Sequence, residues 1–216
     1  MQVLSINVSK KRKIKHLNRE IETGIFKQPL AENKVFIDTL GLVGDEQADL
    51  KNHGGPDKAV YAYGYQHYDY WRQVLPNQPL NYGGFGENLT LAELAEERVQ
   101  IGDTFGLGEA KLQVTQPRVP CFKLGIKFDY LKMPKLFTQS LKTGIYFRVL
   151  KAGEVKVGDK LVLLEQARDS VTVQAVFSAY FMMQKAAATP VIKKAAAHPA
   201  LSVEWRKQLE KYLARN

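Results

Sequence analysis

A change in sequence texture near residue 165 constrains the fold of this chain more than any other feature. Before it, short apolar segments alternate with turns rich in Gly, Pro, Asn and Asp, as in the strands of a barrel or sandwich. After it, Ala, Leu, Lys and Gln dominate, which favours helices. The sequence therefore predicts a mainly β fold with α structure: a β-barrel-like domain over residues 1–165 and a small three-helix domain over 166–216.

The strand candidates of the first domain are short and apolar. In the segment 110–116, Leu112 and Val114 alternate with Gln113 and Thr115, which predicts one buried face and one wetter face. The other segments of this kind are 34–40, 97–103, 145–153 and 159–165.

Helices are expected at two places within the β region and throughout the tail. Apolar residues at helical spacing predict helices over 65–75 and 133–141. In the tail, Pro190 and Pro199 are expected to open helices, because proline suits a first helical turn and opposes a helix interior.

The chain is basic, with a formal net charge of +9. An early cluster contributes five of the cations: Lys10, Lys11, Arg12, Lys13 and Lys15. Such a cluster indicates an anionic partner, either nucleic acid or a small phosphorylated ligand, or else a solvated surface. No zinc-finger or RNP-like motif accompanies the charges, so nucleic acid is the less expected partner.

The chain has one cysteine, which excludes an internal disulfide. Its first residues place a short apolar run before the charges, opposite to the order of a secretory signal. No apolar run approaches the roughly 20 residues that span a bilayer. We therefore expect a cytoplasmic protein without a membrane partner.

The single cysteine, Cys121, lies in the stretch QVTQPRVPCFKLG at residues 113–125. A lone cysteine is often buried and inert. Here Arg118 and Lys123 favour the thiolate, while Pro117 and Pro120 hold the segment as a fixed loop after a strand. The residues alone leave three reactive roles open: a nucleophile, a sulfur carrier or a soft metal ligand.

Other polar residues stand in glycine-rich stretches of the β region. His53 precedes two glycines and is a candidate base, phosphate ligand or loop anchor, and Asn88 in GGFGENL could help to surround an anion. Tyr146 and Arg148 alternate on one strand face, so we expect them to reach a common pocket in which Arg148 could hold a phosphate. There is no His-x-x-x-His spacing or second cysteine, which argues against a conventional zinc site.

Four motifs in a fixed order give the chain a family resemblance. They are GLVGDEQADLKNHGGPDKAV, FGENL, LQVTQPRVPCFKL preceded by Gly-Asp, and GIYFRVLKAGEVKVGD. Together they resemble the MOSC domain, the family named for the C-terminal part of molybdenum cofactor sulfurases, and more narrowly the stand-alone bacterial MOSC proteins of the YiiM type. The resemblance covers residues 1–165 and implies a barrel-like fold similar to the pyruvate kinase insert domain. The tail resembles the three-helix domain that follows MOSC in such proteins.

The resemblance also implies a cofactor and a reaction. Members bind the molybdenum cofactor (molybdopterin) through the motif cysteine, so Cys121 would be both the molybdenum ligand and the catalytic centre. The matching positions imply a cofactor pocket containing the following residues: Arg118, Asn88, Tyr146, Arg148 and His53, with Lys10 or Lys11 near the pterin phosphate. The family includes reductases of N-hydroxylated compounds, and the YiiM type is associated with reduction of 6-hydroxylaminopurine.

Partners follow from the same resemblance. The chain has no flavin, haem or iron–sulfur motif, so a reductase of small N-hydroxylated substrates would need an external electron-donor reductase. The alternative is a sulfur-carrier or cofactor-handling protein that uses a Cys121 persulfide. A third hypothesis is a nucleic-acid binder. We also expect a homodimer formed through Tyr180, Phe181 and Trp205, unless these side chains pack within one chain.

Overall fold

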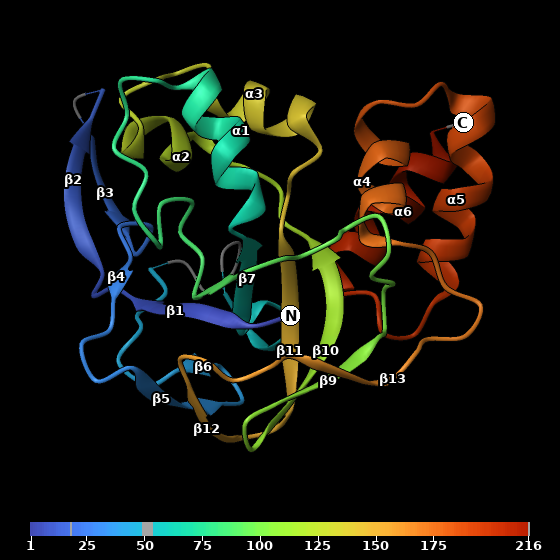
Figure 1. The fold of residues 1–216 in the computed structure, drawn as a ribbon. Helices are drawn as coiled ribbons and strands as arrows, with labels where there is room; N and C mark the ends of the chain where they lie inside the picture. Colours follow the sequence, from blue (N-terminus) through green and yellow to red (C-terminus); the bar gives the residue numbers. More distant parts are fainter. Residues whose placement is uncertain (18, 49–53, 216) are drawn as a thin grey trace.

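An eight-stranded sheet organises the first three quarters of the chain. The computed structural model describes residues 1–17, 19–48 and 54–215 (Figure 1). The strand order is β13-β9-β10-β11-β7-β8-β1-β4, and every neighbouring pair is antiparallel except β7 and β8. The bounds are β1 Val3–Val8, β4 Gln28–Pro29, β7 Val60–Gly64, β8 Leu89–Leu91, β9 Thr104–Leu107, β10 Ala110–Pro117, β11 Ile145–Lys151 and β13 Val162–Glu165.

The start of the chain joins the segment that leads into the last strand of this sheet. Gln2 bridges to Lys160, and the amide of Gly158 donates to the carbonyl of Val3 at 2.9 Å. The sheet therefore curls into a barrel-like shape. Two smaller sheets accompany it: β5 Lys34–Asp38, β6 Gly41–Leu42 and β12 Gly153–Lys156 form one, and the hairpin β2 Arg12–His16 and β3 Arg19–Thr23 forms the other.

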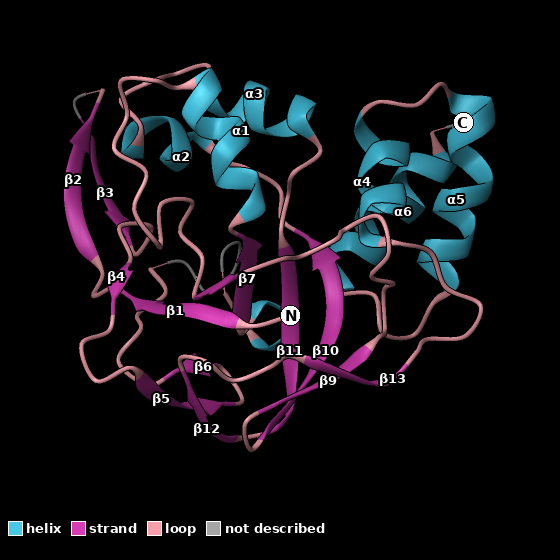
Figure 2. Cartoon of the chain, viewed as in Figure 1, coloured by secondary structure: helices cyan, strands magenta, loops and turns pink. Residues whose placement is uncertain are grey.

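The helices form two groups at different places on the sheet (Figure 2). The first group lies at one end of the barrel: α1 Gln66–Val74, α2 Phe122–Lys127 and α3 Met133–Ser140. The second group follows β13 and packs beside β10: α4 Val173–Phe181, α5 Lys185–Ala197 and α6 Val203–Ala214. A 3₁₀ turn, η1 Pro56–Lys58, precedes β7. The predicted fold class, a β-rich domain followed by a three-helix domain, is confirmed.

One hydrophobic core spans the barrel and the C-terminal helices. Phe105 and Phe147 from the strands belong to the same buried cluster as Phe177 and Trp205 from the helices. A second, aromatic cluster lies under α1 to α3, where the rings of Trp71 and Phe137 stack at 5.8 Å. No helix in the described ranges is long and apolar enough to cross a membrane.

Three expectations about individual segments are wrong. Residues 97–103 form turns rather than a strand, and in them only Gln100 makes an isolated bridge, to Thr172. The next strand, β9, begins after Gly102, whose φ of +93° suits a turn. Pro190 lies inside α5 rather than at its start, and Pro199 precedes the Ser202 cap of α6 by three residues.

The alternation in β10 holds through Val114 and then stops. Thr115 is fully buried, although the pattern predicts a wetter face. The register with β11 shifts between Val114 and Gln116, and the hydroxyl of Thr115 donates to the carbonyl of Asp57 at 2.7 Å. The irregularity points the Thr115 side chain inward, where the carbonyl of Asp57 satisfies its hydroxyl.

The aromatic side chains proposed for a dimer pack largely within the three-helix domain. Trp205 is buried, and its ring lies 5.6 Å from that of Tyr180. Phe181 stays 37% exposed and contacts Phe177. The packing of Trp205 agrees with the intramolecular alternative, and self-association stays a prediction.

Candidate functional site

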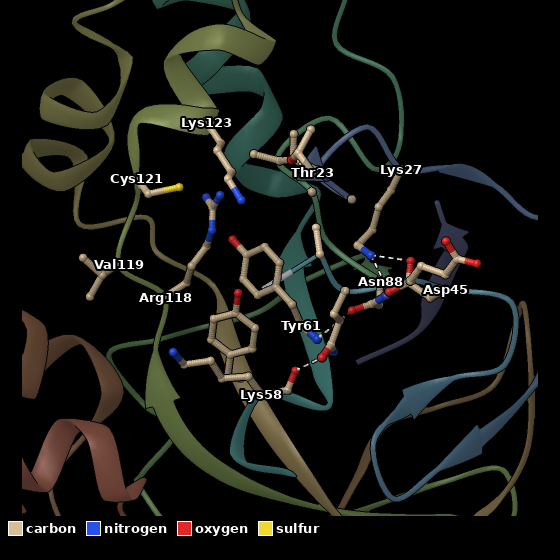
Figure 3. A pocket seen from close by; sticks show the side chains of 17 residues that line it. Thr23, Lys27, Asp45, Lys58, Tyr61, Asn88, Arg118, Val119, Cys121 and Lys123 are labelled. Carbon is tan, nitrogen blue, oxygen red and sulfur yellow. Dashed lines mark hydrogen bonds and ion pairs between the residues drawn. The ribbon is translucent and has the colours of Figure 1, made fainter. Parts of the chain in front are cut away.

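Cys121 opens into a pocket between the barrel and α2 (Figure 3). β10 ends at Pro117, and Pro120 cannot donate a backbone hydrogen bond, so the chain leaves the sheet as an extended loop. Cys121 has φ −121° and ψ 173° and stands at the N-cap position of α2, where its carbonyl accepts a hydrogen bond from the amide of Leu124 at 3.0 Å. The half-buried thiol thus sits on a fixed turn from strand to helix, as the two prolines predict.

The pocket walls come from segments that are far apart in the sequence. Tyr61 on β7 and Tyr146 on β11 face each other there, with ring centroids 5.0 Å apart. Four cations also line the pocket: Lys27, Lys58, Arg118 and Lys123. The cavity measures about 90 Å³, and its lining also includes the carboxylates of Asp45 and Glu46. The four cations outnumber these two carboxylates among the described lining residues, which favours an anionic ligand.

Arg118 is a buried cation with an unused donor. It is 6% exposed, and its Nη1 has no hydrogen-bond partner among the described residues. Its guanidinium lies 5.2 Å from the ring centroid of Tyr61 and 5.0 Å from that of Phe137. Burial lowers the pKa of Arg118, but the neighbouring Tyr61 and Tyr146 phenols outweigh it and raise the pKa. A charged, incompletely satisfied guanidinium is costly unless an anion completes it.

Asn88 holds a wall of the pocket together. Its side-chain oxygen accepts from the amide of Tyr61 at 3.1 Å, and its Nδ2 donates to the carboxylate of Asp45 at 2.9 Å. Asp45 also pairs with Lys27, whose pKa is lowered by burial against the opposing effect of that carboxylate. Asn88 therefore lines the pocket, but its polar atoms are engaged by the protein, and a role in cofactor binding stays a prediction.

Arg148 does not reach this pocket, contrary to expectation. It donates to the Asp57 carboxylate at 2.7 Å and to the carbonyl of Ala200 at 3.0 Å. Two strand residues span roughly 6.8 Å, enough to carry Arg148 from the Tyr146 pocket to the junction with the three-helix domain. Sharing a strand face did not bring the two side chains to one site.

The early basic residues lie beside the pocket rather than in its wall. The Lys10 ammonium is 3.2 Å from the Glu46 carboxylate, and the backbone amide of Lys11 donates to the same group at 3.0 Å. The Lys11 hydrogen bond, followed by that of Lys10, lowers the pKa of Glu46. Glu46 lines the pocket, so it links these exposed residues to the site. His53 lies outside the described residues.

Sequence reasoning missed Lys27, Lys58 and Tyr61 in the pocket. Lys27 stands in a stretch without a motif, so no local signal marks it. Lys58 and Tyr61 follow the glycines of the first motif, and that position is the one available clue. Across the residues that the structure describes, no group of three or more His, Cys, Asp or Glu could hold a metal ion. A metal at this site would thus bring most of its ligands with it.

Comparisons with known proteins agree on the family. The model of the MOSC domain matches residues 49–162, and that of the YiiM-like, 3-alpha helix domain matches residues 171–216. YflK of Bacillus subtilis (strain 168) is 44% identical over 204 residues, covering 94% of this chain and 90% of YflK. YiiM of Escherichia coli (strain K12) is 39% identical over 153 residues, covering 70% of this chain and 68% of YiiM.

A fungal relative and two solved structures extend the comparison. A protein of Gibberella moniliformis named a reductase is 39% identical over 153 residues, which are 69% of this chain and 27% of that protein. The crystal structure of YiiM from Geobacillus stearothermophilus matches with a TM-score of 0.81 at 35% identity, covering 98% of both chains. YiiM from Escherichia coli gives 0.75 at 28% identity, covering 100% of this chain and 94% of that one. The chain belongs to the MOSC domain family and carries the YiiM-like 3-alpha helix domain at its C-terminal end.

Proposed function

We propose that this protein is a molybdenum cofactor-dependent reductase of N-hydroxylated compounds such as 6-hydroxylaminopurine, with Cys121 as a molybdenum ligand. The observation that carries the proposal is that the Cys121 thiol shares its pocket with Arg118, whose buried Nη1 has no partner among the described residues. The Gibberella moniliformis relative named a reductase supports the reaction class.

The residues present suit the molybdenum cofactor. The Cys121 sulfur is a soft ligand, which molybdenum in a dithiolene set favours. Arg118 and Lys123 would bind the anionic end of the pterin, and Tyr61 and Tyr146 would flank it. Asp45 and Asn88 would keep the wall in place, and Lys10 and Lys11 would border its entrance through Glu46. The proposal leaves Arg148 out of the pocket.

The reduction consumes two electrons and two protons, breaks the N–O bond and releases water, leaving an amino group. When bound, the cofactor would supply a metal centre that exchanges two electrons with the substrate. The described pocket residues would bind, orient and shield the reactants. An external electron-donor reductase must deliver the electrons, because no flavin, haem or iron–sulfur motif occurs in the sequence.

The test is the molybdenum-to-protein ratio of the wild type and Cys121→Ala, both produced where the cofactor is made, with pterin fluorescence recorded on the same samples. We expect close to one molybdenum per chain in the wild type and a large loss in Cys121→Ala. Wild-type protein should also reduce 6-hydroxylaminopurine with a reduced dye as electron donor, and Cys121→Ala should not.

Two results would contradict the proposal. One is folded wild-type protein without molybdenum or pterin, even when purified rapidly and anaerobically from cells rich in the cofactor. The other is sulfane sulfur on Cys121 without turnover of hydroxylamines, which would identify a sulfur carrier instead. Lys135→Met, on the exposed surface of α3, is the matched control and should retain metal and activity.

A further inference from the structure

Within the described residues, an ion pair between Lys58 and Glu204 connects the three-helix domain to the pocket. Lys58 is 7% exposed and lines the pocket, and its ammonium pairs with the carboxylate of Glu204 near the start of α6. Lys58 also lines a groove of about 410 Å³ between η1 and α6. The side chain of Lys58 thus stands between the pocket and the groove, with an acid from the second domain holding its charged end.

A set of hydrogen bonds fixes where this acid stands. The Asp57 carboxylate accepts from Arg148 at 2.7 Å and from the amide of Val203, the first residue of α6, at 3.1 Å. The hydroxyl of Ser202 caps the same helix by accepting from the amide of Trp205 at 3.2 Å. Asp57, which precedes Lys58, is therefore hydrogen-bonded to Val203, which precedes Glu204, and this bond fixes the two members of the ion pair relative to each other.

The charge of Glu204 also affects Tyr146 in the pocket. The pKa of Tyr146 is raised, first by burial, against the lowering effect of Arg118, and both Cys121 and Glu204 add to the rise. Glu204 keeps 43% of its side chain exposed, so replacing it leaves the hydrophobic core intact. Glu204 therefore acts on the site through its ion pair with Lys58 and through its charge.

We propose that Glu204 is a positioning residue of the pocket: by holding Lys58, it lets the three-helix domain set the location and effective charge of one pocket wall. An anion that enters the pocket competes with Glu204 for the Lys58 ammonium. The three-helix domain is then part of the binding site rather than an appendage beside it.

The experiment measures the electrostatic potential at Cys121 in cofactor-free protein. Cys121 is the only cysteine, so alkylation by iodoacetate, an anion, and by iodoacetamide, which is neutral, reports on a single site. The ratio of the two rates cancels changes in thiolate fraction and access. Glu204→Gln should raise this ratio about threefold, because the Lys58 ammonium is released from its ion pair toward the anionic reagent, and one unit charge acting over roughly 10 Å in a partly screened interior has this scale. Lys58→Met should lower it.

Two further variants make the result specific. Glu204→Asp keeps the carboxylate and should leave the ratio near the wild-type value. Glu210→Gln removes a carboxylate from an exposed position of the same helix and should also leave it unchanged. In a Lys58→Met background, Glu204→Gln should produce a much smaller rise, because the partner through which it acts is gone.

The proposal is overturned if Glu204→Gln behaves like Glu210→Gln, or if its effect is undiminished in the Lys58→Met background. A lower melting temperature with an unchanged ratio assigns the pair a purely structural role and equally overturns it. Because no cofactor or turnover is involved, failure here is distinguishable from failure of the molybdenum assay.

Discussion

Two cations near the pocket, the buried Arg118 and the half-buried Lys127, differ in their hydrogen-bond partners. Arg118 keeps an N–H without a partner among the described residues, which suits a side chain reserved for a ligand. Lys127 on α2 is instead satisfied by the protein: its Nζ donates to the carbonyls of Ile25 at 2.9 Å and Gly83 at 2.6 Å. Burial lowers the pKa of Lys127 to about 8. The free-energy cost of burying the charged Lys127 ammonium therefore depends on pH.

The pH dependence of stability should reveal this lysine. Its pKa falls from 10.5 to about 8 on folding, so the charged form penalises the folded state fully below pH 8 and the penalty disappears as pH rises to 10.5. Between pH 7.5 and 10, the free energy of unfolding should increase by roughly 2 kcal/mol more in the wild type than in Lys127→Met. Urea unfolding at the two pH values measures the difference. Lys135→Met should follow the wild type, and a Lys127→Met profile parallel to the wild type would refute the assignment.

Side-chain placement could be predicted only where motif and geometry coincide. Cys121 and Arg118 share a short loop, so the sequence itself keeps them near one another. Tyr146 and Arg148 share a strand face, yet the pocket takes only Tyr146. Local periodicity gives the direction of a side chain, whereas its partners come from distant segments such as Asp57, which no periodicity reveals.

Helix α5 contains a proline in its interior, a position that is unfavourable for proline. Pro190 is exposed in the middle of Lys185–Ala197 and has no N–H to donate toward the preceding turn. Pro190→Ala should restore that hydrogen bond and raise the free energy of unfolding by about 1–3 kcal/mol. Thermal and urea unfolding both measure this gain. Pro199→Ala, in the loop before α6, is the control and should give no gain; a Pro190→Ala protein no more stable than the wild type would contradict the expectation.

One helix that sequence reasoning missed is short. The helix α2 has only six residues, with Gly125 within it, too few for a helical period to stand out. Residues 97–103 alternate as a strand does, but the positive φ of Gly102 makes a turn there. Long, strongly patterned segments such as β10 and α6 were predictable because their own residues determine most of their burial.

At the scale of the whole molecule, the two domains share a core. Val114 of β10 and Val176 of α4 belong to the same buried cluster, and Arg148 ties β11 to the carbonyl of Ala200. The β-rich and helical parts could be predicted from the change in texture near residue 165, and the boundary at 165/166 stays a prediction. Their mutual packing could not be predicted, because it joins residues far apart in sequence.

The shared core predicts a single unfolding transition. The chain has two tryptophans, Trp71 in α1 and Trp205 in the three-helix domain, so each domain has its own fluorescence probe. Trp71→Phe and Trp205→Phe isolate the two signals, and within each variant the tryptophan transition should coincide with that of far-ultraviolet circular dichroism. A helical transition that precedes the loss of the β signal would show that the domains unfold independently.

The backbone hydrogen bonds between residues 1–3 and residues 158–161 have a consequence for synthesis. Leu161 donates its amide to the carbonyl of Met1 at 2.7 Å, and Val3 donates to that of Asp159 at 2.9 Å. Residues 1–3 are synthesised first and residues 159–161 only after most of the barrel. One edge of the N-terminal strand therefore stays uncovered until most of the chain has been made. Because such non-local pairings form slowly, the nascent protein exposes an open strand edge during much of its synthesis.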